Sequence, residues 1–295
     1  MRRLALGVLS LAAALAPGAG CGGGITEHDG VSYDDRFGDS TIMDVYVPED
    51  GAATHPGVLF IHGGGWSGGS RAEYSQAASR LARSGYVTAT IEYRLVPGGE
   101  YPKDVQDCLC ALSFFRAQAN EYTLDPKRVA IWGYSAGGHL VSLIGMAASA
   151  GAHQPDCASG PTYAPAAVIT GAGLHDFRDM NPSSGVIHDY LGGSRDEQPD
   201  HYRDASPMAY LHADAPPYLF INGGSDWFVS ADQAYGMRDA LRALGNDATL
   251  LEVKGGGHLL NSTADPGDVT IETSDGTSEA WLAAIDFLDR TVGSP

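Results

Sequence analysis

One serine, Ser135, lies between glycines in the stretch VAIWGYSAGGHL and is the first candidate for chemistry. The apolar run before it is typical of a buried strand, and the segment after it is typical of a helix. A sharp turn from strand to helix needs small residues around the serine, and Gly133 and Gly137 meet that need. The pattern predicts that Ser135 is a nucleophile, although a glycine-rich turn without chemistry could have the same sequence.

A second glycine-rich stretch, LFIHGGGW, also follows a predicted buried strand. Acyl transfer places negative charge on the former carbonyl oxygen, and preorganised backbone N–H donors lower that barrier. We expect the amides of Gly64 and Gly65, together with that of Ala136, to form an oxyanion hole. Gly63 supports the turn, and we expect His62 to order the loop through hydrogen bonds rather than to act as the base. The stretch lacks G-K-[ST], which disfavours a phosphate-binding loop.

A serine nucleophile needs a base, and the base needs an acid that orients it. Asp226 follows the strand-like run YLFIN, and His258 follows the next run, ATLLEV. The order Ser135, Asp226, His258 therefore predicts a catalytic triad, with room for one helix and one strand between acid and base. Asp176, after the run AAVIT, is the alternative acid. We expect His139, on the helix after the nucleophile, to be a packed side chain or a helix cap.

The elements that must position these residues alternate along the chain as short apolar runs and helix-length segments. This alternation predicts one α/β domain with a doubly wound, mostly parallel sheet and helices on both faces. We place the domain at residues 39–290, after a tether and N-terminal segment at 21–38. Residues 151–215, which we call the cap segment, form a long, loop-rich stretch that could cover the site. Residues 261–277 form an acidic insertion of unassigned role.

Four stretches together resemble a known family: HGGGW, the run from EYRLVPGGEYPKDV to GYSAGGHL, ASPMAYLHADAPPYLFINGGSDWFVSADQ, and GGGHLL. Over residues 40–260 the chain resembles α/β-hydrolases of the hormone-sensitive-lipase-like and feruloyl-esterase-like carboxylesterase group. The resemblance implies the roles given above, an ester substrate and no cofactor. The sequence departs from the pattern of this group at Asn222, where the group usually has histidine. Arg94 of the YRLVP run is expected to form a structural ion pair near Asp107.

The charge balance and the N-terminal residues restrict partners and location. With 36 acidic and 18 basic residues, the net charge of −18 argues against nucleic-acid binding. The positive MRR followed by LALGVLSLAAALA predicts a secretory signal at 1–20, because this apolar run is too short to span a bilayer. The following GAGC resembles a bacterial lipoprotein signal. Cys21 would then carry lipid and provide the membrane contact; a periplasmic or secreted protein is the alternative.

The other cysteines are Cys108, Cys110 and Cys157. Export would permit a disulfide. Cys108 and Cys110 point to nearly opposite sides of a predicted helix, so they should not pair with each other. The apolar pattern includes Cys108, which favours Cys110 as the partner of Cys157; three reduced thiols are the alternative. No cysteine pair has zinc-ligand spacing, so no metal is predicted.

These residues together predict a secreted serine esterase. The resemblance implies acetyl, other short-chain or feruloyl-type aromatic esters, as small molecules or attached to polymers. Trp66, Tyr134 and Trp227 flank the motifs and are candidates for lining the pocket, with core packing as the alternative for each. An aryl formamidase or amidase would use the same triad. A non-catalytic cell-surface binding protein of this fold is the alternative from another class. The oligomeric state is not indicated.

Overall fold

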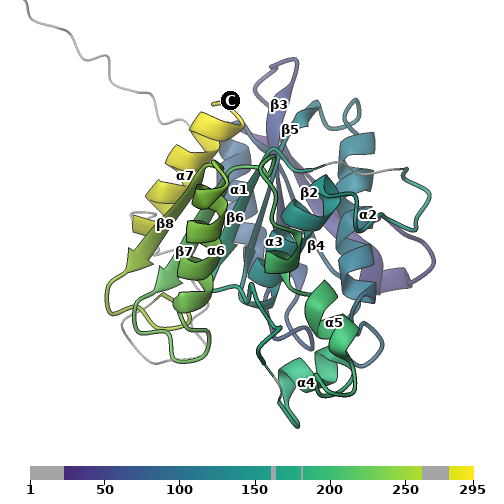
Figure 1. Ribbon diagram of the computed structural model, residues 1–295. Helices are drawn as coiled ribbons and strands as arrows, with labels where there is room; N and C mark the ends of the chain where they lie inside the picture. Colours follow the sequence, from purple (N-terminus) through teal and green to yellow (C-terminus); the bar gives the residue numbers. More distant parts are fainter. Residues whose placement is uncertain (1–22, 161–163, 181, 261–278) are drawn as a thin grey trace, which may run out of the picture.

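The computed structural model describes residues 23–160, 164–180, 182–260 and 279–295 (Figure 1). The predicted signal, Cys21 and the acidic insertion at 261–277 lie outside the described residues. Within them, eight strands form one sheet in the order β1-β2-β4-β3-β5-β6-β7-β8. β2 runs antiparallel to both neighbours, and all pairs from β4 to β8 are parallel. This is the mostly parallel sheet that the alternating pattern predicts.

The elements follow one another along the chain in the expected alternation. The strands are β1 (Ile25–Ser32), β2 (Ile42–Pro48), β3 (His55–Ile61), β4 (Val87–Ile91), β5 (Leu124–Tyr134), β6 (Ala167–Gly171), β7 (Tyr218–Gly223) and β8 (Ala248–Val253). The α-helices are α1 (Ser75–Arg83), α2 (Lys103–Ala117), α3 (Ala136–Ser149), α4 (Val186–Leu191), α5 (Pro199–Asp204), α6 (Asp232–Ala243) and α7 (Glu279–Thr291). Short 3₁₀ helices are η1 (Gly38–Thr41), η2 (Arg71–Tyr74) and η3 (Pro207–Tyr210).

The two faces of the sheet are buried by different helices, because successive strand residues point to opposite faces. On β3, Val58 and Phe60 pack in a cluster with residues of α1 and α7. Leu59 and Ile61 pack in the other cluster, with residues of α2, α3 and α6. The central strands are therefore buried on both faces, which explains why they are continuous apolar runs in the sequence. Within the described residues, no helix is long and apolar enough to cross a membrane.

Strand β1 departs from the sequence prediction. It lies in the segment 21–38, which we expected to be a tether and N-terminal segment before the domain, and it pairs with β2 from Ile25↔Pro48 to Ser32↔Ile42. The sheet thus begins before residue 39. Most residues of β1 are exposed or half-buried, as at a sheet edge, so the strand lacks the apolar run that marks the central strands.

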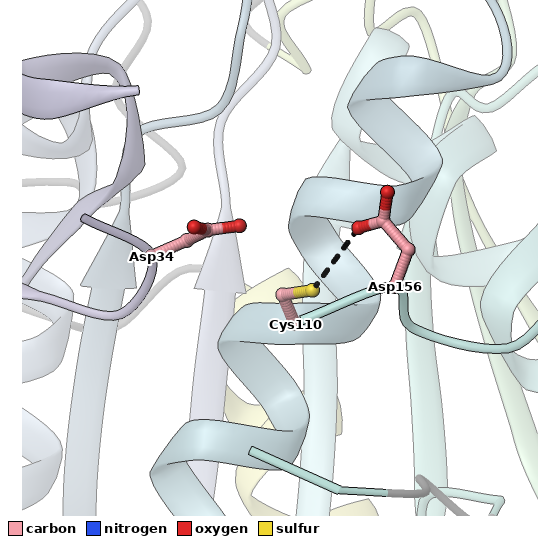
Figure 2. A group of neighbouring side chains, drawn as sticks. All are labelled: Asp34, Cys110 and Asp156. Carbon is pink, nitrogen blue, oxygen red and sulfur yellow. Dashed lines mark hydrogen bonds between the residues drawn. The ribbon is translucent and has the colours of Figure 1, made fainter. Parts of the chain in front are cut away.

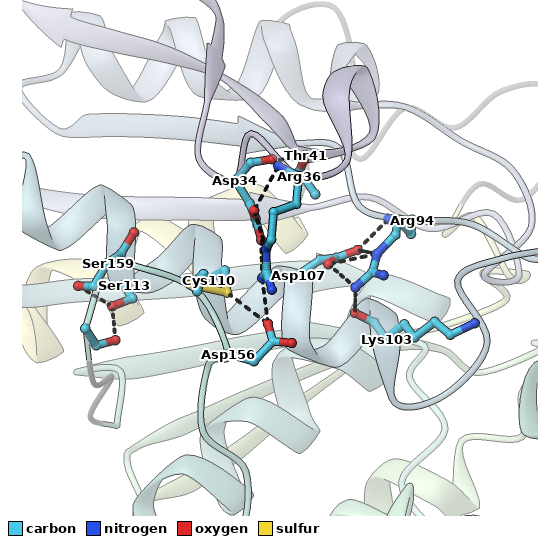
Figure 3. Close-up of a disulfide and its surroundings, with 12 residues drawn as sticks. Asp34, Arg36, Thr41, Arg94, Lys103, Asp107, Cys110, Ser113, Asp156 and Ser159 are labelled. Atoms are coloured by element: carbon cyan, nitrogen blue, oxygen red, sulfur yellow. Dashed lines mark hydrogen bonds and ion pairs between the residues drawn. A yellow bond between two sulfur atoms is a disulfide. The ribbon is translucent and has the colours of Figure 1, made fainter.

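The cap segment is tied to the domain by a disulfide between Cys110 and Cys157. Their Cα atoms are 5.9 Å apart and the residues are 47 apart in sequence, so the bridge joins α2 to the loop before β6 (Figure 3). This is the pairing that the helix pattern favours. Cys108 is a buried free thiol, and burial raises its pKa. Further along the cap segment, α4 and α5 lie together at the lower edge of Figure 1.

The donor set beside this disulfide does not suit a metal. Asp34, Cys110 and Asp156 bring one ligand atom each to within 4.8 Å of one another (Figure 2). However, Cys110 is in the disulfide and therefore offers no thiolate. Arg36 contacts Asp34 at 2.6 Å and Asp156 at 2.9 Å, and Figure 3 shows it between the two carboxylates. The group is therefore an ion-pair cluster that links the N-terminal segment to the cap segment.

Candidate active site

Ser135 occupies the turn between β5 and α3 and adopts φ 55° and ψ −119°. This region of backbone conformation is costly for a residue with a side chain. The turn has no room for side chains at the flanking glycines: a Cβ at Gly137 would lie 2.1 Å from the carbonyl oxygen of Ile61, and one at Gly133 would lie 2.4 Å from that of Gly137. The serine is therefore held in a strained position by a backbone that only glycine permits.

The structure brings Ser135, Asp226 and His258 together. His258 Nε2 lies 2.9 Å from Ser135 Oγ, and His258 Nδ1 lies 2.8 Å from Asp226 Oδ2. In the arrangement that satisfies both bonds, Nδ1–H donates to Asp226 and Nε2 accepts the serine proton. The side chain of His258 is 18% exposed and that of Asp226 is fully buried. This geometry can deprotonate the serine.

Asp226 is positioned by its own loop. Its Oδ1 accepts backbone hydrogen bonds from Phe228 at 2.8 Å and Val229 at 2.9 Å, which leaves Oδ2 for His258. The backbone of His258 is held separately, because the hydroxyl of Tyr134 donates to its carbonyl oxygen. The base is therefore fixed through both its ring and its backbone.

Asp176, the alternative acid, has a different partner. It forms an ion pair with Arg178 at 2.6 Å. Burial by itself would raise the pKa of Asp176, but the hydrogen bonds from Arg178 outweigh burial and lower it. The structure thus joins His258 to Asp226 and not to Asp176.

The loop after β3 carries the amides expected to hold an oxyanion. Gly64 has φ +98°, and a Cβ there would lie 2.2 Å from the carbonyl oxygen of Gly68, so only glycine fits. Among the described residues, we find no acceptor bonded to the amides of Gly64, Gly65 or Ala136. Ala136 begins α3, where the first amides of a helix have no intrahelical partner. These donors are available to a developing negative charge.

His62 supports this loop and does not contact Ser135. It is fully buried, its Nδ1 lies 2.8 Å from the carbonyl oxygen of Gly63, and its ring stacks on Tyr93 at 4.3 Å. The hydroxyl of Tyr93 donates to the carbonyl oxygen of His62 at 3.0 Å. Similarly, Arg94 is paired with Asp107 at 2.7 Å, in the structural role expected for it.

Trp66 follows the glycines but does not line the pocket, contrary to one of the two readings of the sequence. Its indole N–H donates to His139 Nδ1 at 3.2 Å, and its ring stacks on Tyr190 at 4.3 Å. His139 Nε2–H in turn donates to the carbonyl oxygen of Ala205 at 2.8 Å, and burial lowers the pKa of His139 to about 4. The neutral imidazole is therefore a packed core group, and it anchors Trp66 in the core.

Trp227 also lies outside the pocket, for the opposite reason. Its side chain is 85% exposed, because it projects from the loop after Asp226. The neighbouring Phe228 lines the pocket and packs on His258, with ring centroids 5.1 Å apart. Of the three aromatic candidates, only Tyr134 lines the pocket.

The cavity beside Ser135 has a volume of about 570 Å³. One wall comes from η2 and α1, a wall that the sequence motifs did not identify, although its place directly after the oxyanion loop was a usable signal. Val186 is the one lining residue from the described part of the cap segment. The lining residues are Gly63, Gly64, Gly65, Ser67, Ala72, Glu73, Tyr74, Gln76, Ala77, Tyr134, Ser135, Val186, Phe228, His258 and Leu259.

Comparisons with known proteins place the chain in a family. The BD-FAE family model matches residues 43–241. Esterase LipC of Mycobacterium tuberculosis is 33% identical over 75% of this chain and 58% of its own length. The probable carboxylic ester hydrolase LipM of the same organism is 34% identical over 73% of this chain and 52% of its own length. The chain thus spans little more than half the length of these relatives.

Solved structures share the fold. A truncated carbohydrate esterase from gut microbiota superimposes with a TM-score of 0.78 at 24% identity, covering 90% of this chain and 96% of that one. A thermophilic esterase from Thermogutta terrifontis superimposes with a TM-score of 0.71 at 21% identity, covering 92% of each chain. At these identities the likeness establishes the α/β-hydrolase arrangement of strands and helices.

Proposed function

The chain belongs to the BD-FAE family, and from this premise we propose that it is a serine carboxylic ester hydrolase. One observation carries the proposal: the continuous hydrogen-bonded series from Asp226 through His258 to the strained Ser135, at the floor of a cavity. The names of the curated relatives, which are esterases, support the same reaction class.

In the proposed mechanism, His258 takes the proton of Ser135 as its Oγ attacks the ester carbonyl carbon. The carbonyl oxygen becomes negatively charged and accepts hydrogen bonds from the amides of Gly64, Gly65 and Ala136. His258 then returns the proton to the leaving alcohol, and an acyl-enzyme remains. Water, deprotonated by the same imidazole, then attacks the acyl carbon; the bond to Ser135 Oγ breaks, Oγ takes the proton back from His258, and the acid leaves. Asp226 holds His258 in the required tautomer throughout. Every catalytic group in these steps comes from the chain, and the other reactants are the ester and water, so we propose no cofactor.

We propose short-chain or aromatic acyl esters as substrates, including acetyl or feruloyl groups on polymers. The cavity of about 570 Å³ can hold either acyl group, and one structural neighbour is a carbohydrate esterase from gut microbiota. An aryl formamidase remains the second candidate, because the same triad attacks a formyl carbonyl. Hydrolysis rates on acetyl, butyryl, feruloyl and formanilide substrates rank these options directly.

Replacement of the nucleophile tests the reaction class. Wild-type protein should hydrolyse p-nitrophenyl acetate, and Ser135→Ala should reduce kcat by at least about 10³-fold, because the covalent step is lost. Retained hydrolysis in Ser135→Ala would refute the proposed mechanism. A wild-type chain inactive on the whole substrate panel would favour a non-catalytic binding protein of this fold.

We further propose export and attachment to a bacterial membrane through lipid on Cys21, which rests on the N-terminal sequence alone. Cys21→Ser should move the protein from the membrane fraction to the soluble fraction of the producing cells. The same distribution for both proteins would exclude the lipid anchor and leave the periplasmic or secreted alternative.

A further inference from the structure

The charge inside the pocket comes from one carboxylate. Among the described lining residues, Glu73 is the only acidic side chain, and none is lysine or arginine. Glu73 belongs to η2 and is solvent-exposed in the pocket wall. A charge in a concave site acts on charged ligands that enter, because the protein walls replace part of the solvent that would screen it.

The carboxylate is held in place. Its Oε1 accepts a hydrogen bond from the backbone amide of Ser70 at 3.1 Å, while the amide of Glu73 donates to the carbonyl oxygen of Ser70, also at 3.1 Å. The bond from the Ser70 amide is the half of a capping box that the N3 side chain supplies, and it restricts the carboxylate of Glu73, which lines the pocket. The charge therefore has a defined position.

This position is beside the oxyanion loop. A Cβ built at Gly69 would lie 3.0 Å from Glu73 Oε1 and 2.7 Å from the carbonyl oxygen of Gly63. Burial raises the pKa of Tyr93, whose hydroxyl contacts the same loop, and the charge of Glu73 adds to this rise. Glu73 therefore lies beside the loop whose amides would bind the substrate carbonyl oxygen.

No lysine or arginine side chain neutralises this charge within the described part of the chain, and the nearby imidazole of His62 has its Nδ1 bonded to the carbonyl oxygen of Gly63. The neighbouring Arg71 is paired with Asp44 at 2.8 Å and with Glu92 at 3.0 Å. No ion pair joins Glu73 to any described basic side chain. The net charge of −18 acts in the same direction at long range.

We infer that Glu73 is a specificity-determining residue, which disfavours anionic esters and favours neutral or cationic ones. The inference rests on the proposed esterase function and adds a substrate class to it. For a substrate charge about 7 Å from the carboxylate, Coulomb's law gives an effect of roughly 3- to 50-fold, depending on the effective dielectric. Added salt should reduce the effect, because the pocket is open to solvent.

Two substrate pairs of matched shape isolate the charge. Mono-p-nitrophenyl succinate carries a carboxylate that p-nitrophenyl butyrate lacks, and acetylcholine carries a cation that 3,3-dimethylbutyl acetate lacks. In Glu73→Gln, kcat/KM for the anionic ester relative to its neutral partner should rise about tenfold. The cationic-to-neutral ratio should fall by a similar factor. Glutamine keeps an oxygen acceptor for the amide of Ser70, so the capping bond is preserved.

Glu197→Gln is the matched control. Glu197 also accepts a bond from the amide of a serine three residues earlier, Ser194, at 2.9 Å, but it does not line the pocket. The substitution changes net charge equally and should leave both ratios within about twofold of wild type. If Glu73 served only to cap η2, both ratios would be unchanged in Glu73→Gln. Unchanged ratios, in a variant that still hydrolyses the neutral esters, would overturn the inference. Absence of any ester hydrolysis by wild type would instead overturn the proposed function, and the inference with it.

Discussion

Two loops beside Ser135 each contain a tryptophan, and the two side chains have opposite environments. In the loop after β3, Trp66 is 3% exposed, stacked on Tyr190 and hydrogen-bonded to His139. In the loop after β7, Trp227 is 85% exposed. The first loop must hold backbone amides in place and is anchored to the core by a side chain. The second must hold one carboxylate, which two amides of the same loop already fix. Both loops thus hold catalytic groups, but only the first is anchored by a core side chain, so we expect loss of its tryptophan to reduce stability and loss of the carboxylate of Asp226 to reduce activity.

The sharpest test of this division is the acid. Asp226→Asn should reduce kcat by about 10⁴-fold, because an amide at this position favours the wrong tautomer of His258. The free energy of unfolding should change far less, since the change is nearly isosteric and an oxygen can still accept the bonds from Phe228 and Val229. Steady-state kinetics and urea unfolding of the same preparation measure both effects. A loss of activity explained by unfolding would contradict the division.

The oxyanion loop should respond in the opposite way. Trp66→Ala removes a buried aromatic ring and leaves the imidazole of His139 without its donor, so we expect a loss of about 3–5 kcal/mol in the free energy of unfolding. Trp66→Phe, which keeps the stacking on Tyr190, should lose less. Equal losses in the two variants would show that the hydrogen bond, and not packing, anchors the loop.

His139 makes the same anchor sensitive to pH. Burial lowers its pKa to about 4, whereas the unfolded value is near 6.5, so the unfolded chain binds more protons in this window. The free energy of unfolding should therefore fall as pH decreases from about 6.5 to 4, by up to about 3 kcal/mol. His175, whose pKa burial lowers to about 3, adds to the fall. His139→Gln should be less stable at pH 7 and show a shallower decline in urea unfolding between pH 7 and 4; an equally steep decline would exclude His139 as a source.

Trp227 provides the smallest expected effect. Because its side chain is almost fully exposed, Trp227→Ala should change the free energy of unfolding by no more than about 0.5 kcal/mol. Thermal unfolding of Trp227→Ala beside Trp66→Ala gives the comparison directly. Similar destabilisation by the two substitutions would remove the distinction between the loops.

The sequence predicts most of what is local in this molecule. The elbow at Ser135 and the loop at Gly64 depend on glycines because a Cβ at these positions would meet backbone atoms, and runs of such glycines are recognisable as short motifs. The central strands are recognisable because burial on both faces makes them continuous apolar runs. Helix periodicity favours Cys110 over Cys108 as the partner of Cys157, and the structure has this disulfide, although three reduced thiols were compatible with the sequence.

Features set by tertiary packing were harder to predict. The orientation of Trp66 depends on Tyr190 and His139, which are distant from it in sequence, and that of Trp227 depends on the course of its own loop. The edge strand β1 is too polar to show a buried pattern, and no sequence motif includes Glu73, which lines the cavity because η2 lies beside Ser135. Neighbours distant in sequence decide these positions.

Covalent labelling of Ser135 tests the central claim most directly. A fluorophosphonate reacts only with a serine whose oxygen is activated by a base, so intact-mass analysis of the purified protein should show one adduct, located at Ser135 by peptide mapping. Ser135→Ala should show none, and Asp226→Asn should react much more slowly than wild type. An unlabelled wild-type protein, or an adduct at another residue, would contradict the assignment of Ser135, His258 and Asp226 as the catalytic machinery.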